Sequence, residues 1–438
     1  MTWRQEIARA RRWLTDRDRR KRIMRWPLSR IFRAVENRLI GVGQLPAAQV
    51  HRILVLRPHH RLGNIVLLTP LISELVHVFP GARIDVLIAG GAANEMVEGY
   101  PNIGRIYCMP RSIVSDFPAT VQIMRSIRRK RYDLAIDPSI NSRTGRLVLA
   151  YAAPRFLMGV PEPENNAWMH VMFSAPRHLS KIPVFILRHA LADDACVNDT
   201  VYPALAMQLS LLERQAGLRT LQALSQPAED GRSRKILGVF AAASDARRLT
   251  QSWWLQFLAT IRARLPEYVV VEILSEDGCS RLDNRFPAHH SSSPRELASV
   301  MSNLTHFISA NTDVMHLACA AGTPTIGLFS ATDASLYEPY GRHNQALNTP
   351  GKSPEEVAEL AIRTLTRPVP DRPMGSRTGH GNAPTPFRRE VRRAEPLLCC
   401  GYTAGCPPSG RYGTIHWPGP IPRVSQYLAV RDDRARVQ

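Results

Sequence analysis

One stretch, residues 301–341, constrains the fold more than any other part of the chain. In order, it predicts a short strand, a polar loop, a helix of small residues with a Gly-Thr-Pro stop, and a second buried strand. The loop residues Asn311, Thr312 and Asp313 favour a helix start at this point. Because a helix start offers unpaired N–H groups and the positive end of the helix dipole, the segment predicts a phosphate site. His316 follows one turn inside the helix, where it could face the phosphate.

Strands and helices alternate in two separate regions of the chain. The predicted strands are 52–57, 82–89, 132–137, 235–240, 269–276, 305–309 and 325–329, and the predicted helices are 65–79, 251–264, 294–302 and 355–365. Pro70 interrupts the helical pattern of 65–79, so the helix either kinks there or starts again with Thr69 as a cap. This βαβ alternation predicts an α/β fold with doubly wound parallel sheets.

The length of 438 residues exceeds what one core usually holds, so the chain is expected to form two domains with extensions. The predicted parts are a basic amphipathic arm (1–50), a Rossmann-like domain (51–205), a polar linker (206–234), a second Rossmann-like domain (235–366) and a tail (367–438). The tail is rich in Pro, Gly and Arg and lacks periodicity. It is therefore expected to be disordered.

The net charge of +20 points to an anionic partner. Residues 1–40 hold thirteen Lys or Arg against four acids, with Trp3, Trp13 and Trp26 among them. Such a basic helix with interfacial tryptophans predicts contact with an anionic membrane surface. A solvated basic arm without a specific partner is an equally open interpretation. Nucleic acid is not expected, because no aromatic-basic platform or DNA-reading motif accompanies the charge.

Targeting and cysteine patterns predict a cytoplasmic protein, with peripheral attachment to the inner face of the membrane left open. The amino terminus lacks the apolar core of a secretory signal, and no segment has the apolar length of a membrane span. The seven cysteines are scattered without metal-ligand spacing, which favours a reduced protein without a bound metal.

Two motifs of the chain are informative together: GNIVLLTP (63–70) and ANTDVMHLACAAGTPTIGLF (310–329). In combination they resemble glycosyltransferase family nine, the ADP-heptose:lipopolysaccharide heptosyltransferases and their relatives. The resemblance covers about residues 50–366. It implies a GT-B fold, in which two Rossmann-like domains face each other across a cleft. The first would bind the acceptor and the second the nucleotide-sugar donor, with inversion at the anomeric carbon and without a metal or other cofactor.

The resemblance also implies a set of donor-binding residues. Thr312 and His316 match a Thr and a His of the family motif, whereas Asn311 replaces the usual Asp and Asp313 the usual Gly. The other implied donor residues are Arg247 and Arg248, where relatives carry a phosphate-binding Lys, and Glu276, which matches a Glu that binds the ribose. The alternative interpretations are solvated loop residues and a helix histidine with ordinary partners.

The general base departs from the family pattern. Heptosyltransferases place an Asp directly after the first-loop glycine, whereas here Asn64 follows Gly63, and an amide does not accept a hydroxyl proton. The same acceptor-side loop contains His59, His60 and Arg61. The candidate substitute bases are His60, which we favour, Asp137 and Asp313. These considerations predict an inverting, metal-independent transferase that moves a sugar, such as heptose, from an ADP-sugar or related donor to a lipopolysaccharide-type glycan. The alternative is a nucleotide-sugar-binding or scaffold protein that does not turn over.

Overall fold

A computed structural model defines the fold of the protein. The residues that it describes are 32–58, 62–110, 116–140, 142–161, 166–191, 201–224, 234–243, 249–341 and 343–367. Four predictions lie outside these residues: the membrane contact of the first 31 residues, the loop residues His59, His60 and Arg61, the phosphate contact of Arg247 and Arg248, and the disorder of the tail after residue 367.

The first half of the chain forms a five-stranded parallel sheet in the order β3-β2-β1-β4-β5. The strands are β1 Arg52–Arg57, β2 Arg83–Ala89, β3 Ile103–Met109, β4 Leu134–Asp137 and β5 Phe156–Gly159. The helices are α4 Leu62–Val66, α5 Thr69–Val78, α6 Phe117–Lys130, α7 Arg143–Ala152, α8 Asn166–Met172 and α9 Ile182–Ala190, with short 3-10 turns η1 Ala47–Gln49 and η2 Gly91–Met96. The crossovers place helices on both faces, so the sheet is buried on both sides.

Strand β1 shows how the sequence produces this two-sided burial. Successive side chains of a strand point to opposite faces. Ile53 and Val55 belong to the hydrophobic cluster that includes α5 and α9 residues, whereas Leu54 and Leu56 belong to the cluster that includes α6 and α7 residues. All four are fully buried. The uninterrupted apolar run of RILVLR is therefore what a central parallel strand requires.

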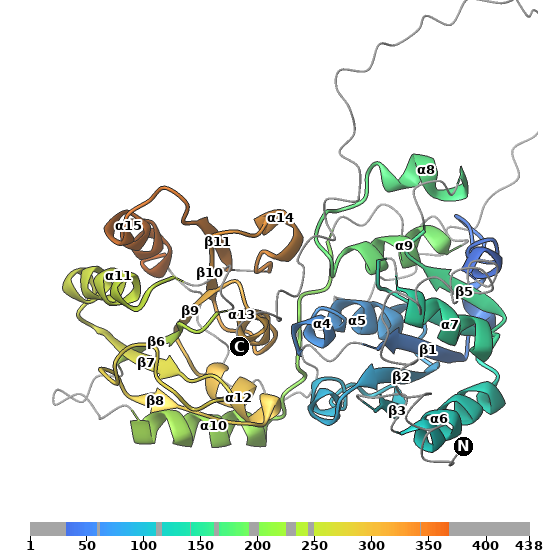
Figure 1. The fold of residues 1–438 in the computed structure, drawn as a ribbon, viewed down its shortest axis with the longest axis horizontal. Coiled ribbons are helices and arrows are strands. Elements are labelled where there is room, and N and C mark those ends of the chain that lie inside the picture. Colours follow the sequence, from blue (N-terminus) through green and yellow to red (C-terminus); the bar gives the residue numbers. More distant parts are fainter. Residues whose placement is uncertain are drawn as a thin grey trace, which may run out of the picture. The chain divides into compact units, whose positions relative to one another are not determined.

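The second half forms a six-stranded parallel sheet in the order β11-β10-β9-β6-β7-β8. Its strands are β6 Lys235–Phe240, β7 Tyr268–Ile273, β8 Ala288–His289, β9 His306–Ala310, β10 Thr325–Phe329 and β11 Gln345–Asn348. Its helices are α10 Leu211–Leu224, α11 Gln251–Arg264, α12 Pro294–Met301, α13 Asp313–Ala320, α14 Ala334–Tyr337 and α15 Pro354–Leu365. Helices α11 and α15 pack together, as do α10 and α12 (Figure 1).

Each sheet has one point at which the strand order reverses. In the first sheet this switch lies between β1 and β4, and in the second it lies between β6 and β9. The loops that follow neighbouring strands run in opposite directions at such a switch, which opens a crevice at the carboxyl ends of the strands where ligands bind. Gly63, Asn64 and Asp137 follow or end the two strands at the first switch, and Asn311, Thr312 and Asp313 follow β9 at the second.

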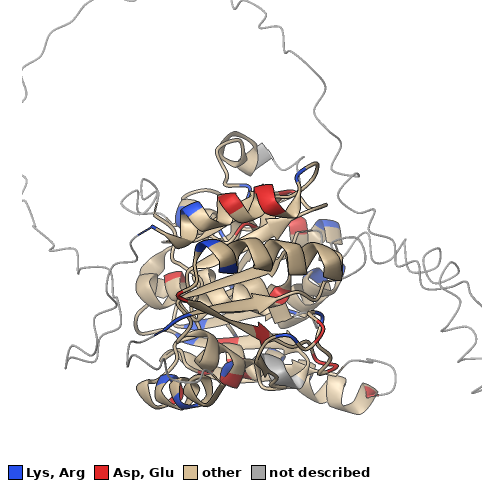
Figure 2. Cartoon of the chain, turned by 90° about the vertical axis from the view of Figure 1, so that its left-hand side faces the viewer, with Lys and Arg blue, Asp and Glu red and all other residues tan. Residues whose placement is uncertain are grey.

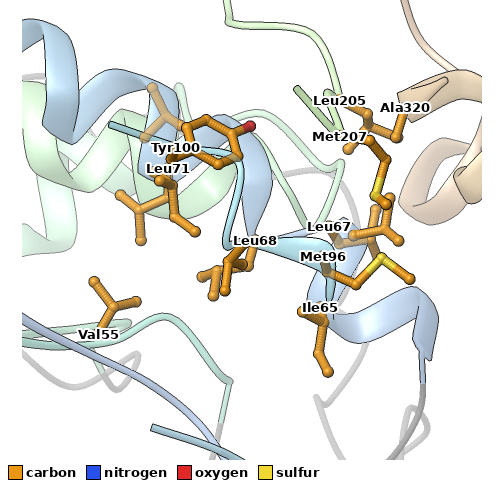
Figure 3. Packing of buried hydrophobic residues seen from close by; sticks show 14 of the residues in the cluster. Val55, Ile65, Leu67, Leu68, Leu71, Met96, Tyr100, Leu205, Met207 and Ala320 are labelled. Carbon is orange, nitrogen blue, oxygen red and sulfur yellow. The ribbon is translucent and has the colours of Figure 1, made fainter. Parts of the chain in front are cut away.

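The segment 201–210 joins the halves and is packed against both of them. Leu205 and Met207 lie in the cluster that also contains α4, α5 and α13 residues (Figure 3). The Met207 amide donates to Ala320 O (3.0 Å), and Tyr100 Oη donates to Ala206 O (3.0 Å). The connection is therefore part of the core rather than a free tether.

The predicted fold class is confirmed, and several boundaries differ. Pro70 does mark a second helix start, but Leu68 rather than Thr69 precedes the helix, and Thr69 Oγ1 donates to Val66 O instead of capping. The predicted linker contains helix α10, which packs on α12. Residues at the end of the predicted arm are core residues: Val35, Ile40 and Leu45 are buried. Within the described residues, no helix has the length and apolar character to cross a membrane.

Candidate functional site at the switch points

Arg57, the last residue of β1, organises the first switch point. Its guanidinium donates through Nε to Asn64 O (3.1 Å), through Nη2 to Asn64 Oδ1 (3.0 Å) and through Nη1 to Ser139 Oγ (2.9 Å). Burial lowers the pKa of Arg57, and the nearby charges of Asp137 and Tyr337 oppose that shift. Arg57 thus fixes Asn64 through both its backbone and its side chain. Because Asn64 Oδ1 accepts a hydrogen bond from Arg57 Nη2, the side-chain amide of Asn64 is held as a structural partner of Arg57.

Asp137, a predicted base, is enclosed at the end of β4. Its side chain is fully buried, and Oδ1 accepts from the Ser139 amide (3.1 Å). Oδ2 lies 4.0 Å from Arg146 Nη1 and has no hydrogen-bond partner. Burial raises the pKa of Asp137, and the charge of Arg146 opposes the rise. Gly145 covers Oδ2 so closely that a β-carbon there would lie 1.9 Å away. Asp137 is therefore enclosed by residues of its own loop and of α7, and its role as a base remains a prediction.

The second switch point carries the predicted phosphate-binding residues. Thr312 is the N-cap of α13, but its side chain makes no capping hydrogen bond and lies 3.0 Å from Ser309 Oγ instead. Asn311 is buried, and its backbone N–H donates to Leu328 O (3.0 Å). Asp313 is the first residue of the helix. The Thr312 side chain therefore leaves the helix amides to another acceptor, as a phosphate site requires.

The two switch points meet at Gly63 and Asp313. Helix α13 contacts helix α4, and a β-carbon on Gly63 would lie 2.4 Å from Asp313 Oδ1 and 3.1 Å from Asp313 Cα. Only glycine allows this approach. The Asp313 carboxylate consequently lies over the glycine that precedes Asn64. The residues that sequence analysis assigned to separate donor and acceptor loops are neighbours.

His316 faces the interior rather than an open surface. Its side chain is 3% exposed, and Nδ1 has no hydrogen-bond partner. Burial, with a smaller contribution from the neighbouring His178, lowers the pKa of His316 to about 3. His178 is equally buried, with a pKa near 4 that burial causes. Its Nε2 bonds to Glu338 O (2.9 Å) and its Nδ1 to Ser180 Oγ (2.9 Å). Both imidazoles are therefore neutral at physiological pH.

Glu276 lies beyond the end of its strand. The prediction of a strand to Glu276 was wrong by three residues, since β7 ends at Ile273, and Glu276 is exposed in the turn that follows. Glu272, inside the strand, is the buried acid of this region: it accepts from Ser280 Oγ (2.5 Å) and from the Arg281 amide (2.7 Å). Glu272 thus holds the loop, and Glu276 is free to contact a ligand.

Sequence reasoning missed two residues of this region, Arg57 and His178. Arg57 had a local signal, because a cation that ends an apolar strand next to a polar loop needs a polar partner. His178 had none, since it reaches the second half through a contact between residues 160 positions apart. Among the described residues, no group of three His, Cys, Asp or Glu side chains is arranged to hold a metal ion.

Residues 294–362, from α12 to α15, match the family model of glycosyltransferase family 9 (heptosyltransferase). The resemblance to family 9 is confirmed. No curated protein matches the chain.

Solved structures of the family 9 group share the architecture of the whole described body. A family 9 glycosyl transferase from Veillonella parvula is 17% identical, covers 74% of this chain and 99% of its own, and superimposes with a TM-score of 0.60. The E. coli ADP-heptose lps heptosyltransferase II is 16% identical, with coverage of 72% and 98% and a TM-score of 0.52. E. coli heptosyltransferase WaaC with ADP is 13% identical, with coverage of 72% and 99% and a TM-score of 0.52. The fold is therefore the GT-B type, and the chain is heptosyltransferase-like in fold and in its second-half motif.

Proposed function

We propose that the protein is an inverting, metal-independent glycosyltransferase that moves a sugar from a nucleotide-diphosphate donor to a glycan acceptor. The observation that supports this proposal is the contact of the α13 amino terminus with Gly63 of α4, because these two segments are the ones proposed to bind the donor phosphates and the acceptor. The family 9 match over 294–362 supports the reaction class. Similarity to structures named for ADP and ADP-heptose favours an ADP-sugar donor and a lipopolysaccharide-type acceptor.

The chemistry assigns separate tasks to the two halves. The acceptor hydroxyl oxygen forms a bond to the anomeric carbon, the bond from that carbon to the diphosphate oxygen breaks, and the diphosphate leaves with the electron pair. The α13 amides stabilise the charge that develops on the diphosphate, with Thr312 beside them. A nearby base accepts the hydroxyl proton. Arg247 and Arg248, which follow β6 in the sequence, are proposed to bind the phosphates, and Glu276 the ribose.

We propose Asp313 as the base. In this chain the loop position of the usual family Asp holds Asn64, whose Oδ1 accepts from Arg57. The position of the usual family Gly holds Asp313, whose carboxylate lies against Gly63. The carboxylate near this contact therefore comes from α13 of the second half, at Asp313, instead of from the residue after Gly63 in the first half. Asp137 is a weaker candidate because it is fully buried and faces Arg146.

An exchange of the two positions tests the base. Asp313→Asn should lower kcat at least a hundredfold, the typical contribution of a general base. Asn64→Asp with Asp313→Gly, which restores the family arrangement, should recover most of the lost rate. His60→Ala is the matched control and should leave kcat within a few-fold of the natural chain. A large loss in His60→Ala with normal turnover in Asp313→Asn would assign the base to His60 instead.

A panel of ADP- and UDP-sugars in a thermal-shift assay tests the donor. A ligand that binds only the native state raises the apparent stability by mass action. ADP-sugars should raise the melting temperature more than UDP-sugars, and Thr312→Val should reduce the shift. The absence of any shift across the panel would contradict the proposed function.

A second function, nucleotide-sugar binding without turnover, is favoured by one observation, the engagement of Asn64 by Arg57. It predicts donor binding by the natural chain but transfer only by the Asn64→Asp variants. Transfer by the natural chain would eliminate it.

A further inference from the structure

Helix α6 presents an uncompensated cationic face. Its sequence, FPATVQIMRSIRRK, contains four basic residues and no acid. Only Thr120 and Ile127 of the helix are buried. Among the described residues, Arg125 and Arg129 have no carboxylate partner, whereas Arg128 Nη1 donates to Tyr151 O (2.8 Å). The charges of Arg125 and Arg129 therefore face solvent.

The same face carries exposed apolar groups. Residues at four-residue spacing lie one above another on a helix, and Phe117, Val121, Arg125 and Arg129 have that spacing. Together with Pro118, Gln122 and Ser126 they line an open groove of about 520 Å³. Phe117 is 61% exposed. One helix face thus combines an exposed aromatic ring at its first turn with cations at its middle and end.

This combination differs from the ordinary surface of the protein. Figure 2 shows acidic and basic residues interspersed on the face toward the viewer. Helix α15, for example, carries three glutamates beside one arginine. Cations at the carboxyl end of a helix also stabilise its dipole, which accounts for Arg128, Arg129 and Lys130 but not for Arg125 or for the exposed Phe117.

We infer that the exposed face of α6 docks on an anionic lipid bilayer. Interfacial helices use cationic side chains at the headgroup level and aromatic or aliphatic side chains just below it, which matches Arg125 and Arg129 with Phe117 and Val121. A nucleic acid would engage the charges and could stack on Phe117, but it gives no role to the half-buried aliphatic side chain of Val121. The surface is separate from the basic arm, and the inference does not depend on the proposed transferase activity.

Vesicle sedimentation of the full-length protein tests the inference. The natural chain should bind phosphatidylcholine vesicles that contain phosphatidylserine more tightly than phosphatidylcholine alone, and salt should weaken that binding. Each cation near an anionic surface strengthens binding about fivefold, so Arg125→Gln with Arg129→Gln should weaken it about 25-fold. Phe117→Ser should weaken it as well, with less dependence on salt.

The matched control removes the same charge from the second half. Arg219 of α10 and Arg363 of α15 are both exposed, and their double substitution by Gln should leave vesicle binding within about twofold. Equal losses of vesicle affinity in the two double variants would show that only the net charge of the protein matters, and would overturn the inference. Unchanged vesicle binding by the Arg125→Gln, Arg129→Gln variant would also overturn the inference. If that variant instead lost affinity for a short RNA, the face would be a nucleic-acid site. Unchanged melting temperatures would confirm that each variant is folded.

Discussion

At the scale of single residues, two glycines decide which side chains can approach each other. Gly63 admits the Asp313 carboxylate, and Gly145 admits Asp137. Neither glycine has a positive φ, so both are required by space rather than by backbone conformation. The sequence motif GNIVLLTP contains Gly63, but nothing in it predicts the partner, because the contact joins α4 of the first half to α13 of the second.

Gly145→Ala should destabilise the protein. A β-carbon would lie 1.9 Å from Asp137 Oδ2 and 2.7 Å from Ser142 Oγ, and Asp137 is too enclosed to move aside. The overpacking should cost about 1–3 kcal/mol in the free energy of unfolding, measured by urea denaturation, despite the better helix propensity of alanine. Gly81→Ala is the control. Nothing lies within 4 Å of its β-carbon, so its effect should stay within about 0.5 kcal/mol.

The site also shows why residue-level prediction stops where it does. Thr312 and Asp313 follow from local helix-start rules, and the structure places them at the start of α13. The roles predicted for them remain predictions, as does the role of His316, which is enclosed by residues distant in sequence. Sequence alone fixes a residue's place along its helix but not the neighbours that tertiary packing brings to it.

At the scale of elements, local sequence signals predicted the central strands of both sheets and helices α5, α11, α12, α13 and α15. Helices α6, α7 and α9 were not predicted, although α6 has 14 residues. The predictions for β1, β10 and α11 match in both boundaries, because apolar runs and a Thr cap mark their ends. Short edge elements such as β8 and β11 were not predicted, since two to four residues carry too little pattern. Helix α10 was missed because its sequence is weakly amphipathic and only two of its residues are buried.

Two serine caps provide a comparison of local and long-range stabilisation. Ser353 forms a capping box with Glu356 at the start of α15. Ser293 caps α12 through the Glu296 amide (3.1 Å) and also donates to Glu95 Oε2 of the first half (2.6 Å). Ser353→Ala should cost about 1 kcal/mol in the free energy of unfolding. Ser293→Ala should cost more, because it also leaves Glu95 without that donor.

Chemical denaturation of both variants checks this order. Ser353→Asp retains a side-chain acceptor at the cap and should restore most of the stability that alanine loses. Equal costs for the two alanine variants would mean that the Glu95 contact contributes nothing measurable.

At the scale of the whole molecule, the body is held together by polar contacts between sequence-distant segments as well as by the core. Residues 177–181 of the first half meet residues 333–340 of the second: the Leu179 amide donates to Leu336 O (3.2 Å) and Arg177 pairs with Asp333 (2.8 Å). His178 and His316 lie in this region, both buried and both neutral. The paired α/β plan could be predicted from the repeated strand–helix pattern, but this contact region could not, because its members have no shared local signal.

The two histidines make stability depend on pH in a defined window. Each has a folded-state pKa, near 4 for His178 and near 3 for His316, below the ordinary value of 6.5, because burial disfavours the charged ring. The unfolded chain therefore binds more protons than the folded chain below about pH 6.5, and stability falls as the pH falls through that value. Depressed carboxyl pKa values, such as that of Glu213 near 2, act only at lower pH.

Between about pH 7.5 and about pH 5, His178 and His316 should each lower the free energy of unfolding by about 2 kcal/mol, which is about 4 kcal/mol together. Buried His289, whose pKa is also lowered by burial, adds in the same direction. Asp137 acts in the opposite direction, because burial raises its pKa and the folded chain binds that proton more tightly than the unfolded chain. His316→Leu should remove about half of this pH dependence while retaining the buried apolar volume, and urea titrations of both chains at the two pH values measure the difference. An unchanged slope in the variant would mean that His316 is protonated or solvated in the folded state. In that case the α13 amino terminus is more open than its packing indicates.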